Sequence, residues 1–326
     1  MKDVKKAHFL AMILMILWGM SYLSIKVVVH EIHPVLSAFY RFLIAAIILF
    51  IYLKVRYPEE KVLKEDKIKM ALGGFFGVAM YFLFENYAVY FTTASNVAII
   101  ISSIPIFTLI SQRIIFKEKI NMIKAIGASL SIIGIGIILL SKGKVSLFSK
   151  GTIGDLMGIG AALCWVAYTV VISKLKGNYR SIVITTYQTI WGCIFLSPSI
   201  FIFQHSMPST KAIANLLYLS FFCTCIGYAI YIYCQNKLGA TVITTYINLQ
   251  PIVSIISAKI LLNENINSKQ ILGSAIIIIG LFLASKSEKI NKQIIKALIG
   301  EIKKRLKNET FLLYISFSFI SSSSFI

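Results

Sequence analysis

The sequence predicts an all-helical integral membrane protein, with ten transmembrane helices arranged as two inverted five-helix repeats. Three observations support this prediction: an apolar composition, ten long apolar windows and an internal repeat. Of the 326 residues, 57% are hydrophobic and 14% are charged. Soluble domains are only about 45–50% apolar and carry about 25% charged residues. The composition therefore indicates a chain that lies mostly in a bilayer.

Ten windows are long and apolar enough to be membrane spans, because about 20 apolar residues cross the hydrocarbon core as a helix. Strands of a membrane barrel would alternate polar and apolar residues, and these windows do not. The first window is too long for a signal-peptide core and lacks a small-residue cleavage site, so we expect it to be retained. The windows are 10–29, 35–53, 70–90, 95–115, 122–141, 154–173, 182–204, 213–234, 241–262 and 270–285.

The net charge of +20 is distributed according to membrane topology. With the N-terminus in the cytoplasm, the inside segments hold 25 of the 33 Lys and Arg residues, and the outside loops hold five. This is the positive-inside pattern, and it predicts a multi-pass protein of the cytoplasmic membrane with both termini in the cytoplasm. We therefore attribute the basic residues to anionic lipid at the cytoplasmic face, and not to nucleic acid.

The chain repeats itself at a spacing of 146–147 residues. Because each copy holds five spans, an odd number, the second copy must enter the membrane from the opposite side. Such inverted repeats place a substrate site between the halves, near the bilayer midplane. We place the repeats at 8–141 and 151–286. The matched residues include Trp18 with Trp165, Arg41 with Gln188, Ala94 with Ala240, Pro105 with Pro251, Glu118 with Glu264 and Gly127 with Gly273.

The order of motifs in both halves resembles the EamA domain of the drug/metabolite transporter superfamily. The first half reads "ILWGMSYLSIK", "FYRFLIAAIIL" and "AVYFTTASNVAIIISSIPIFTLI", and the second reads "LCWVAYTVVISKL" and "NKLGATVITTYINLQPIVSII". The resemblance covers roughly residues 8–286. It implies a ten-helix fold of two inverted repeats and secondary transport of small metabolites, often amino acids or related compounds. It does not specify the substrate.

Two matched prolines interrupt apolar windows. Pro105 and Pro251 each remove one helical hydrogen bond and clash with a carbonyl four residues earlier, at a cost of about 3 kcal/mol. Freed carbonyls at membrane depth need protein or a water-filled cavity around them. We expect both prolines to bend the fourth and ninth helices around a central cavity and to act as hinges. The alternative is a static kink that improves packing.

Three ionisable residues gather at one depth, in the outer half of the first three helices. Glu85 is the only acidic residue well inside a window. It is a candidate site for a proton, a cation or a substrate amine. Alternatively, Glu85 forms an ion pair with Arg41 or Lys26 that orients these helices. Arg41 resembles the arginine usual at this place in the family, and we expect Lys26 to reach outward to the interface. The second repeat has Gln188 and Tyr231 at the positions of Arg41 and Glu85.

Aromatic and amide side chains complete the predicted substrate site. Trp18 and Trp165 lie mid-span, away from the interfaces where aromatic residues usually gather. They could stack on a ring or face an ammonium group, or they could simply pack helices together. We expect Gln250, beside Pro251, to face the cavity, although such amides often only join helices, at about 0.6 kcal/mol each. The other predicted substrate-binding residues are Tyr22, Tyr81, Asn86, Tyr168, Gln188 and Tyr246.

Residues 287–326 differ in character from the rest of the chain. Ile290, Ile294, Leu298, Ile302 and Leu306 recur four apart among basic residues. This spacing predicts a basic amphipathic helix on the inner leaflet. The alternative is a solvated, partly disordered tail.

The sequence thus favours a secondary transporter that works by alternating access, with efflux of amino acids or related metabolites as the first choice. The alternative transport function is proton-coupled uptake of a cationic or nucleoside-like metabolite. Two alternatives from other functional classes are a lipid flippase and a membrane-embedded enzyme. An enzyme would need clusters of His, Asp and Glu inside the membrane, and it is disfavoured because all four histidines lie at window ends or in loops. No Walker loop is present, so we do not expect ATP to drive transport directly. We expect a small-molecule substrate, no cofactor, no metal, and either a monomer or a homodimer.

Overall fold

The computed structural model describes residues 2–115, 117, 122–139, 150–205, 207–262 and 268–286. The chain divides into compact units of residues 1–284 and 285–326. The predicted amphipathic tail, 287–326, lies outside the described residues. All regular secondary structure in the described ranges is helical, as predicted.

The first half of the chain runs from α1 to α7. A π-helical segment, Phe75–Met80, joins α3 to α4, so these three pieces form one long helix. The bounds are α1 Lys2–Glu31, α2 Pro34–Arg56, α3 Lys64–Gly74, α4 Tyr81–Phe91, α5 Ala94–Ile101, α6 Ile104–Ile115 and α7 Met122–Leu139.

The second half repeats this order from α8 to α15. A second π-helical segment, Leu219–Ile226, joins α11 to α12, and a 3₁₀ turn, Ile247–Leu249, joins α13 to α14. The bounds are α8 Lys150–Ser173, α9 Ser181–Leu196, α10 Ser199–Ile202, α11 Thr210–Tyr218, α12 Gly227–Leu238, α13 Ala240–Tyr246, α14 Gln250–Leu262 and α15 Ser268–Lys286.

The described residues contain seven helices long and apolar enough to cross a membrane. The protein is therefore a multi-pass membrane protein, as the sequence predicted, whereas the count of ten spans stays a prediction. The predicted window 182–204 is not a single helix. Its first helix, α9, ends at Leu196, and α10 begins after Pro198. Proline has no backbone N–H to donate, so it cannot continue the helical hydrogen bonding.

Each of the two matched prolines begins a new helix. Pro105 is the second residue of α6, and Ser102 and Ser103 separate α6 from α5. Pro251 is the second residue of α14, after the 3₁₀ turn. Proline fits the first turn of a helix because the N–H that it lacks would have no partner there. The chain is therefore interrupted at both places, and does not run on as one bent helix.

Glycines allow close approaches between helices of the two halves. A Cβ atom on Gly77 would lie 2.4 Å from the ring of Tyr168 on α8. A Cβ atom on Gly74 would lie 2.6 Å from the carbonyl oxygen of Gln188 on α9. Small residues permit such contacts between membrane helices. They bring the α3–α4 helix directly against α8 and α9.

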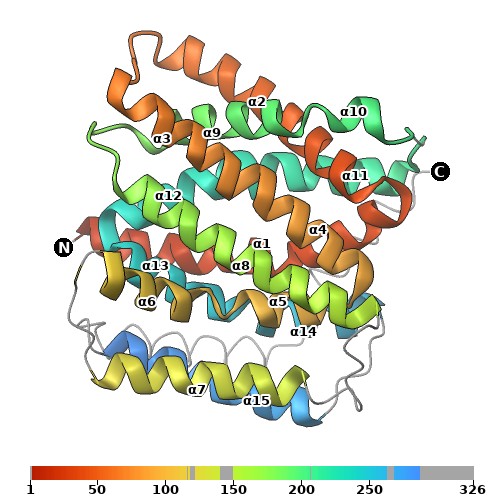
Figure 1. Ribbon diagram of the computed structural model, residues 1–326, viewed down its shortest axis with the longest axis vertical. Helices are drawn as coiled ribbons and strands as arrows, with labels where there is room; N and C mark the ends of the chain where they lie inside the picture. The colour runs from red at the N-terminus through yellow and green to blue at the C-terminus, as the bar shows by residue number, and fades with distance from the viewer. Residues whose placement is uncertain are drawn as a thin grey trace. The chain divides into compact units, whose positions relative to one another are not determined.

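The matched helices α1 and α8 run in opposite directions (Figure 1). Near the end of α1, Lys26 Nζ donates to the carbonyl of Thr92 (2.7 Å). Four residues later in the chain, Asn96 Nδ2 donates to Asp155 Oδ1 (3.0 Å), close to the start of α8. The start of α8 therefore lies near the end of α1.

Two ends of the bundle can be distinguished by their polar contacts. One end, here called the basic end, holds Lys61, Lys64, Lys67, Lys69, Lys174, Lys176 and Arg180. There Asp66, near the start of α3, accepts a hydrogen bond from Gly177 N in the link 174–180 (2.9 Å). At the opposite end, Glu31 accepts a hydrogen bond from Ser209 N (2.7 Å).

Candidate functional site

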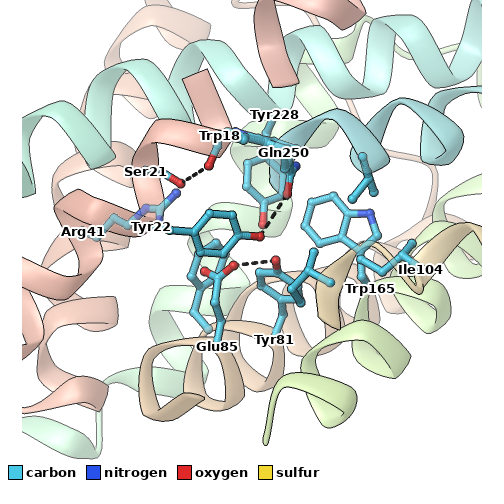
Figure 2. A pocket seen from close by; sticks show the side chains of 13 residues that line it. Trp18, Ser21, Tyr22, Arg41, Tyr81, Glu85, Ile104, Trp165, Tyr228 and Gln250 are labelled. Carbon is cyan, nitrogen blue, oxygen red and sulfur yellow. Dashed lines mark hydrogen bonds between the residues drawn. The ribbon is translucent and has the colours of Figure 1, made fainter. Parts of the chain in front are cut away.

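A small cavity lies between helices of both halves of the chain (Figure 2). Its free volume is about 20 Å³, which is enough for about one water molecule. Pockets for small ligands are about 300 Å³ or larger, so this cavity must enlarge to take a metabolite. The lining residues are Trp18, Ser21, Tyr22, Arg41, Tyr81, Phe82, Glu85, Ile101, Ile104, Trp165, Tyr228, Ile247 and Gln250.

Glu85 supplies the negative group of the cavity. Its side chain is 4% exposed, and its Oε1 atom accepts a hydrogen bond from the hydroxyl of Tyr81 (2.6 Å). Tyr81 stands four residues earlier on α4, so the two side chains share one face of the helix. Among the described residues, Tyr81 is the only hydrogen-bond donor to this carboxylate. The carboxylate therefore retains the capacity to accept hydrogen bonds from a ligand.

Arg41 supplies the positive group. Its Nε atom donates to Thr224 Oγ1 (2.8 Å), and its guanidinium lies 4.3 Å from the centre of the Phe82 ring. That distance is typical of a cation–π contact. Within the part of the chain that the structure describes, no ion pair joins Arg41 to Glu85. Thr224 and Phe82 hold the guanidinium in place while its terminal nitrogens keep their donor capacity.

Lys26 reaches the end of α4. Its Nζ atom donates to the backbone carbonyls of Val89 and Thr92, both at 2.7 Å. These carbonyls belong to the end of α4, where the last C=O groups of a helix have no N–H partner within the helix. Lys26 therefore holds the end of α4 and does not line the cavity.

Aromatic rings form much of the cavity wall. Trp18 and Trp165 meet edge to face, with ring centroids 5.4 Å apart, and the Tyr81 ring lies 4.9 Å from that of Trp165. The indole of Trp18 donates to the carbonyl of Cys223 (3.0 Å), and that of Trp165 donates to the hydroxyl of Tyr231 (3.0 Å). With both indole N–H groups bonded to protein, the ring faces and edges remain for contact with a ligand.

Gln250 contributes a neutral polar group. Its Oε1 atom accepts a hydrogen bond from the hydroxyl of Tyr22 (2.9 Å), and its Nε2 atom lies 3.4 Å from the sulfur of Met15. A thioether sulfur is a weak acceptor. The amide can therefore exchange this contact for a stronger one with a ligand.

The structure brings seven of the predicted site residues together around the cavity, and places the other seven elsewhere. Asn86 donates to the carbonyl of Pro34 (2.8 Å) and thus joins α4 to the start of α2. The hydroxyl of Tyr246 bonds to Nδ1 of His8 (2.7 Å). The residues that line the cavity are Trp18, Tyr22, Arg41, Tyr81, Glu85, Trp165 and Gln250; the others are Lys26, Asn86, Pro105, Tyr168, Gln188, Tyr246 and Pro251.

Sequence reasoning missed several residues of the wall, among them Ser21, Phe82 and Tyr228. Phe82 stands three residues before Glu85, and Tyr228 stands three residues before Tyr231. Residues three apart share a helix face, so this spacing was an available signal. It is weak, because aromatic residues three apart are equally common in ordinary helix packing.

The described residues include no group of three or more His, Cys, Asp or Glu that could hold a metal ion. The polar groups of the cavity instead come from helices of both halves, inside a bundle apolar enough for a membrane. This construction, with a polar site between two related halves, is typical of secondary transporters.

Comparison with known proteins identifies the family. The model of the EamA-like transporter family matches residues 5–140 and again 152–286. This chain belongs to the EamA-like transporter family, which confirms the resemblance seen in the sequence. It is therefore a transporter and not an enzyme.

Individual relatives agree with this assignment. An uncharacterized transporter of Archaeoglobus fulgidus is 30% identical over 287 residues, which cover 87% of this chain and 98% of that protein. A probable amino-acid metabolite efflux pump of Salmonella typhimurium is 24% identical, covering 86% of this chain and 94% of that protein. A protein of known crystal structure shares the fold, with a TM-score of 0.67 at 16% identity over 86% of this chain and 98% of its own.

Proposed function

We propose that this protein is a secondary transporter that exports amino acids or related zwitterionic metabolites by alternating access. It works in the cytoplasmic membrane with both termini inside, and its ten spans form two inverted five-helix repeats, residues 8–141 and 151–286. The observation that carries the proposal is the presence of Arg41 and Glu85 in one cavity without an ion pair between them.

The charges of the cavity match those of a zwitterion. The guanidinium of Arg41 would bind a substrate carboxylate, since guanidinium–carboxylate pairs form strong, directional hydrogen bonds. The carboxylate of Glu85 and the neighbouring aromatic faces would bind an ammonium group. Ile101, Ile104 and Ile247 give the same cavity an apolar wall. This wall would contact the hydrocarbon part of an amino acid.

The two helix interruptions support alternating access. The Ser102–Ser103 turn and the 3₁₀ turn Ile247–Leu249 each precede a helix whose second residue is proline. Broken helices at matched positions in two halves are typical of transporters whose halves rock about a central site. Pro105 and Pro251 would then let the two parts of each helix change their angle as the cavity opens.

Efflux is supported by relatives, since the Salmonella typhimurium protein and a 22% identical protein of Escherichia coli are both named probable amino-acid metabolite efflux pumps. The alternative function is proton-coupled uptake of a cationic metabolite. It is favoured by the buried Glu85 among aromatic rings, because such a carboxylate could hold a proton and a cation in turn.

The test is transport by the purified protein in liposomes, with a panel of labelled amino acids, amines, nucleosides and a lipid, with and without a pH gradient. We expect counterflow of amino acids. Uptake of amines that requires the pH gradient would favour the alternative. Movement of lipid alone would favour a flippase, and both outcomes would contradict amino-acid export.

The variant Glu85→Gln tests the role of the carboxylate in the same liposomes. Its amide oxygen can still accept the hydrogen bond from Tyr81, so we expect the thermal unfolding temperature (Tm) to stay close to that of wild type. Transport should fall at least tenfold, because the group that balances the substrate ammonium is lost. Normal transport together with a lower Tm would instead assign Glu85 a purely structural role.

A further inference from the structure

A second set of buried polar residues occupies the positions in the second half that correspond to the cavity wall of the first. At the spacing of 146–147 residues, Ser21, Tyr22, Arg41 and Glu85 correspond to Tyr168, Thr169, Gln188 and Tyr231. All four residues of the second set are 0% exposed.

Several polar atoms of this second set have no hydrogen bond of standard geometry. Both the Nε2 and Oε1 atoms of Gln188 lack one, and so does the hydroxyl of Tyr168, which lies next to the Gln188 amide. The Oε1 atom of Gln235, a neighbour whose Nε2 atom donates to the carbonyl of Thr169 (3.3 Å), lacks one as well. Leaving a buried polar group unpaired costs about 1–3 kcal/mol. Native proteins contain few such groups, and each calls for a physical reason.

The side chain of Tyr168 closes the space that its counterpart leaves open. Tyr168 packs on Gly77, and its ring centroid is 5.0 Å from that of Trp165. Ser21, at the matching position of the first half, is small and lines the cavity. The residues of the first half, which we call the first set, therefore border open space. In the second set, the ring of Tyr168 occupies the corresponding space.

The two sets lie toward different ends of the bundle. Arg41 follows the start of α2 by seven residues, next to the opposite end. Gln188 follows the start of α9 by seven residues, next to the basic end. At 1.5 Å per residue, each lies about 10 Å from its own end of the bundle.

We propose that Gln188 and Tyr168 form a second substrate subsite, which takes the same zwitterionic metabolite through neutral hydrogen bonds when the bundle opens at the basic end. This inference rests on the proposed function. In alternating access, the two inverted halves exchange conformations. The residues that are packed closed in one state then border the open cavity in the other state. A glutamine amide can donate to a carboxylate and accept from an ammonium group, which gives its unpaired atoms a use.

The first test is the variant Gln188→Met, which keeps the length of the side chain and removes both unpaired atoms. We expect counterflow of the best-transported amino acid to fall at least tenfold while Tm stays equal to or above that of wild type. The matched control is Thr189→Val. The hydroxyl of Thr189 is also buried without a partner, but Phe42, the residue that corresponds to Thr189 in the first half, does not line the cavity. Transport by Thr189→Val should therefore stay within twofold of the wild-type rate. Wild-type transport by Gln188→Met, or a fall in its Tm of more than 5 °C, would overturn the proposal.

The second test does not require a known substrate. In a chain freed of its five native cysteines, Gln188→Cys should react with a membrane-impermeant methanethiosulfonate reagent applied at the basic end, and Thr189→Cys should not. An excess of the best-transported amino acid should slow the reaction at least threefold. No reaction, or a reaction that this amino acid does not slow, would contradict the subsite. If wild type transports no amino acid but Gln188→Cys still reacts, the result contradicts the proposed substrate and still supports a polar site that is accessible from the basic end.

Discussion

The rings of Trp18 and Trp165 meet edge to face, with centroids 5.4 Å apart and an interplanar angle of 88°. These residues occupy the same position in the two repeats, 147 residues apart. In a symmetric assembly, a residue touches its own counterpart only close to the symmetry axis. The contact therefore supports a pseudo-twofold axis that passes between the two indoles, beside the cavity that both of them line.

The two tryptophans should be energetically coupled. We expect the single variants Trp18→Phe and Trp165→Phe and the double variant to show a coupling free energy of about 0.5–1.5 kcal/mol, the range for aromatic pairs in double-mutant cycles. The measurement is unfolding of the purified protein in detergent. The third tryptophan, Trp191, serves as the control, since it stacks on Phe195, and its replacement by Phe should be additive with Trp18→Phe. Additivity of Trp18→Phe and Trp165→Phe would contradict the contact.

Arg41 should not be replaceable by lysine. Arg41→Lys retains the positive charge, but it loses the Nε bond to Thr224 and the contact of the guanidinium with the Phe82 ring. Because a compact ammonium cannot reproduce bidentate binding of a carboxylate, we expect the KM for an amino acid to rise at least tenfold. Thr224→Val removes only the support of Nε, and it should raise KM less, by about threefold. Equal KM values for wild type and Arg41→Lys would show that Arg41 does not bind the substrate carboxylate.

Asp66 should be a major source of stability at the basic end. Its carboxylate is 0% exposed and accepts hydrogen bonds from Lys69 Nζ (2.6 Å), Gly177 N (2.9 Å) and the hydroxyl of Tyr179 (2.9 Å). It thereby joins the start of α3 to the link 174–180. Asp66→Asn removes the charge and turns part of the acceptor into a donor. We expect a loss of about 3 kcal/mol in the free energy of unfolding, since breaking a buried pair costs about 3–5 kcal/mol.

The neighbouring residue provides the control for Asp66. Glu65 pairs with Lys176 at 2.5 Å, but both side chains are about two-thirds exposed, at 65% and 67%. Exposed pairs contribute about 0–1 kcal/mol, so Glu65→Gln should change the free energy of unfolding by less than about 1 kcal/mol. Similar losses for the two variants would mean that the burial of Asp66 has no special effect.

His33 should make stability depend on pH. It caps the start of α2, where its Nδ1 atom accepts a hydrogen bond from Val35 N (3.4 Å), and its ring stacks on Phe203 with centroids 3.7 Å apart. Burial lowers the pKa of the His33 imidazole below its ordinary value of 6.5. The unfolded chain therefore binds this proton at a higher pH than the folded chain does. The stability from His33 is complete above about pH 6.5 and is lost as the pH falls through the lowered pKa.

The comparison of wild type with His33→Asn isolates this effect, because asparagine is a good N-cap that does not titrate. We expect the Tm of wild type to decrease more than that of His33→Asn between pH 7.5 and pH 5. Parallel Tm curves for the two proteins over this range would exclude a contribution from His33.

The sequence was a good guide to the helices and to part of the cavity. Long apolar windows predicted where helices lie, because hydrophobic length acts locally. Pro105 and Pro251 predicted a disturbed helix at both places, but as a bend and not as the start of a new helix. The π-helical segments Phe75–Met80 and Leu219–Ile226 were not predicted. They contain no proline, so the signal that marks the other interruptions is absent from them.

The composition of the cavity wall was harder to predict, for a reason that Gln188 and Arg41 illustrate. They are equivalent in the repeat, yet only Arg41 lines the cavity. At the matched position on the preceding helix, one half has Ser21 and the other has Tyr168, and only Ser21 lines the cavity. A pattern along one helix carries no information about such tertiary contacts.

The most direct measurement of substrate binding uses the fluorescence of Trp18 and Trp165, which both line the cavity. The chain has three tryptophans, so Trp191→Phe leaves fluorescence from these two alone. Titration of that variant in detergent with the best-transported amino acid should give a saturable change in emission, and adding Glu85→Gln should abolish it at the same concentrations. A variant that transports this amino acid but shows no change in emission at saturating concentration would contradict the account, because the substrate would then cross the membrane by another route.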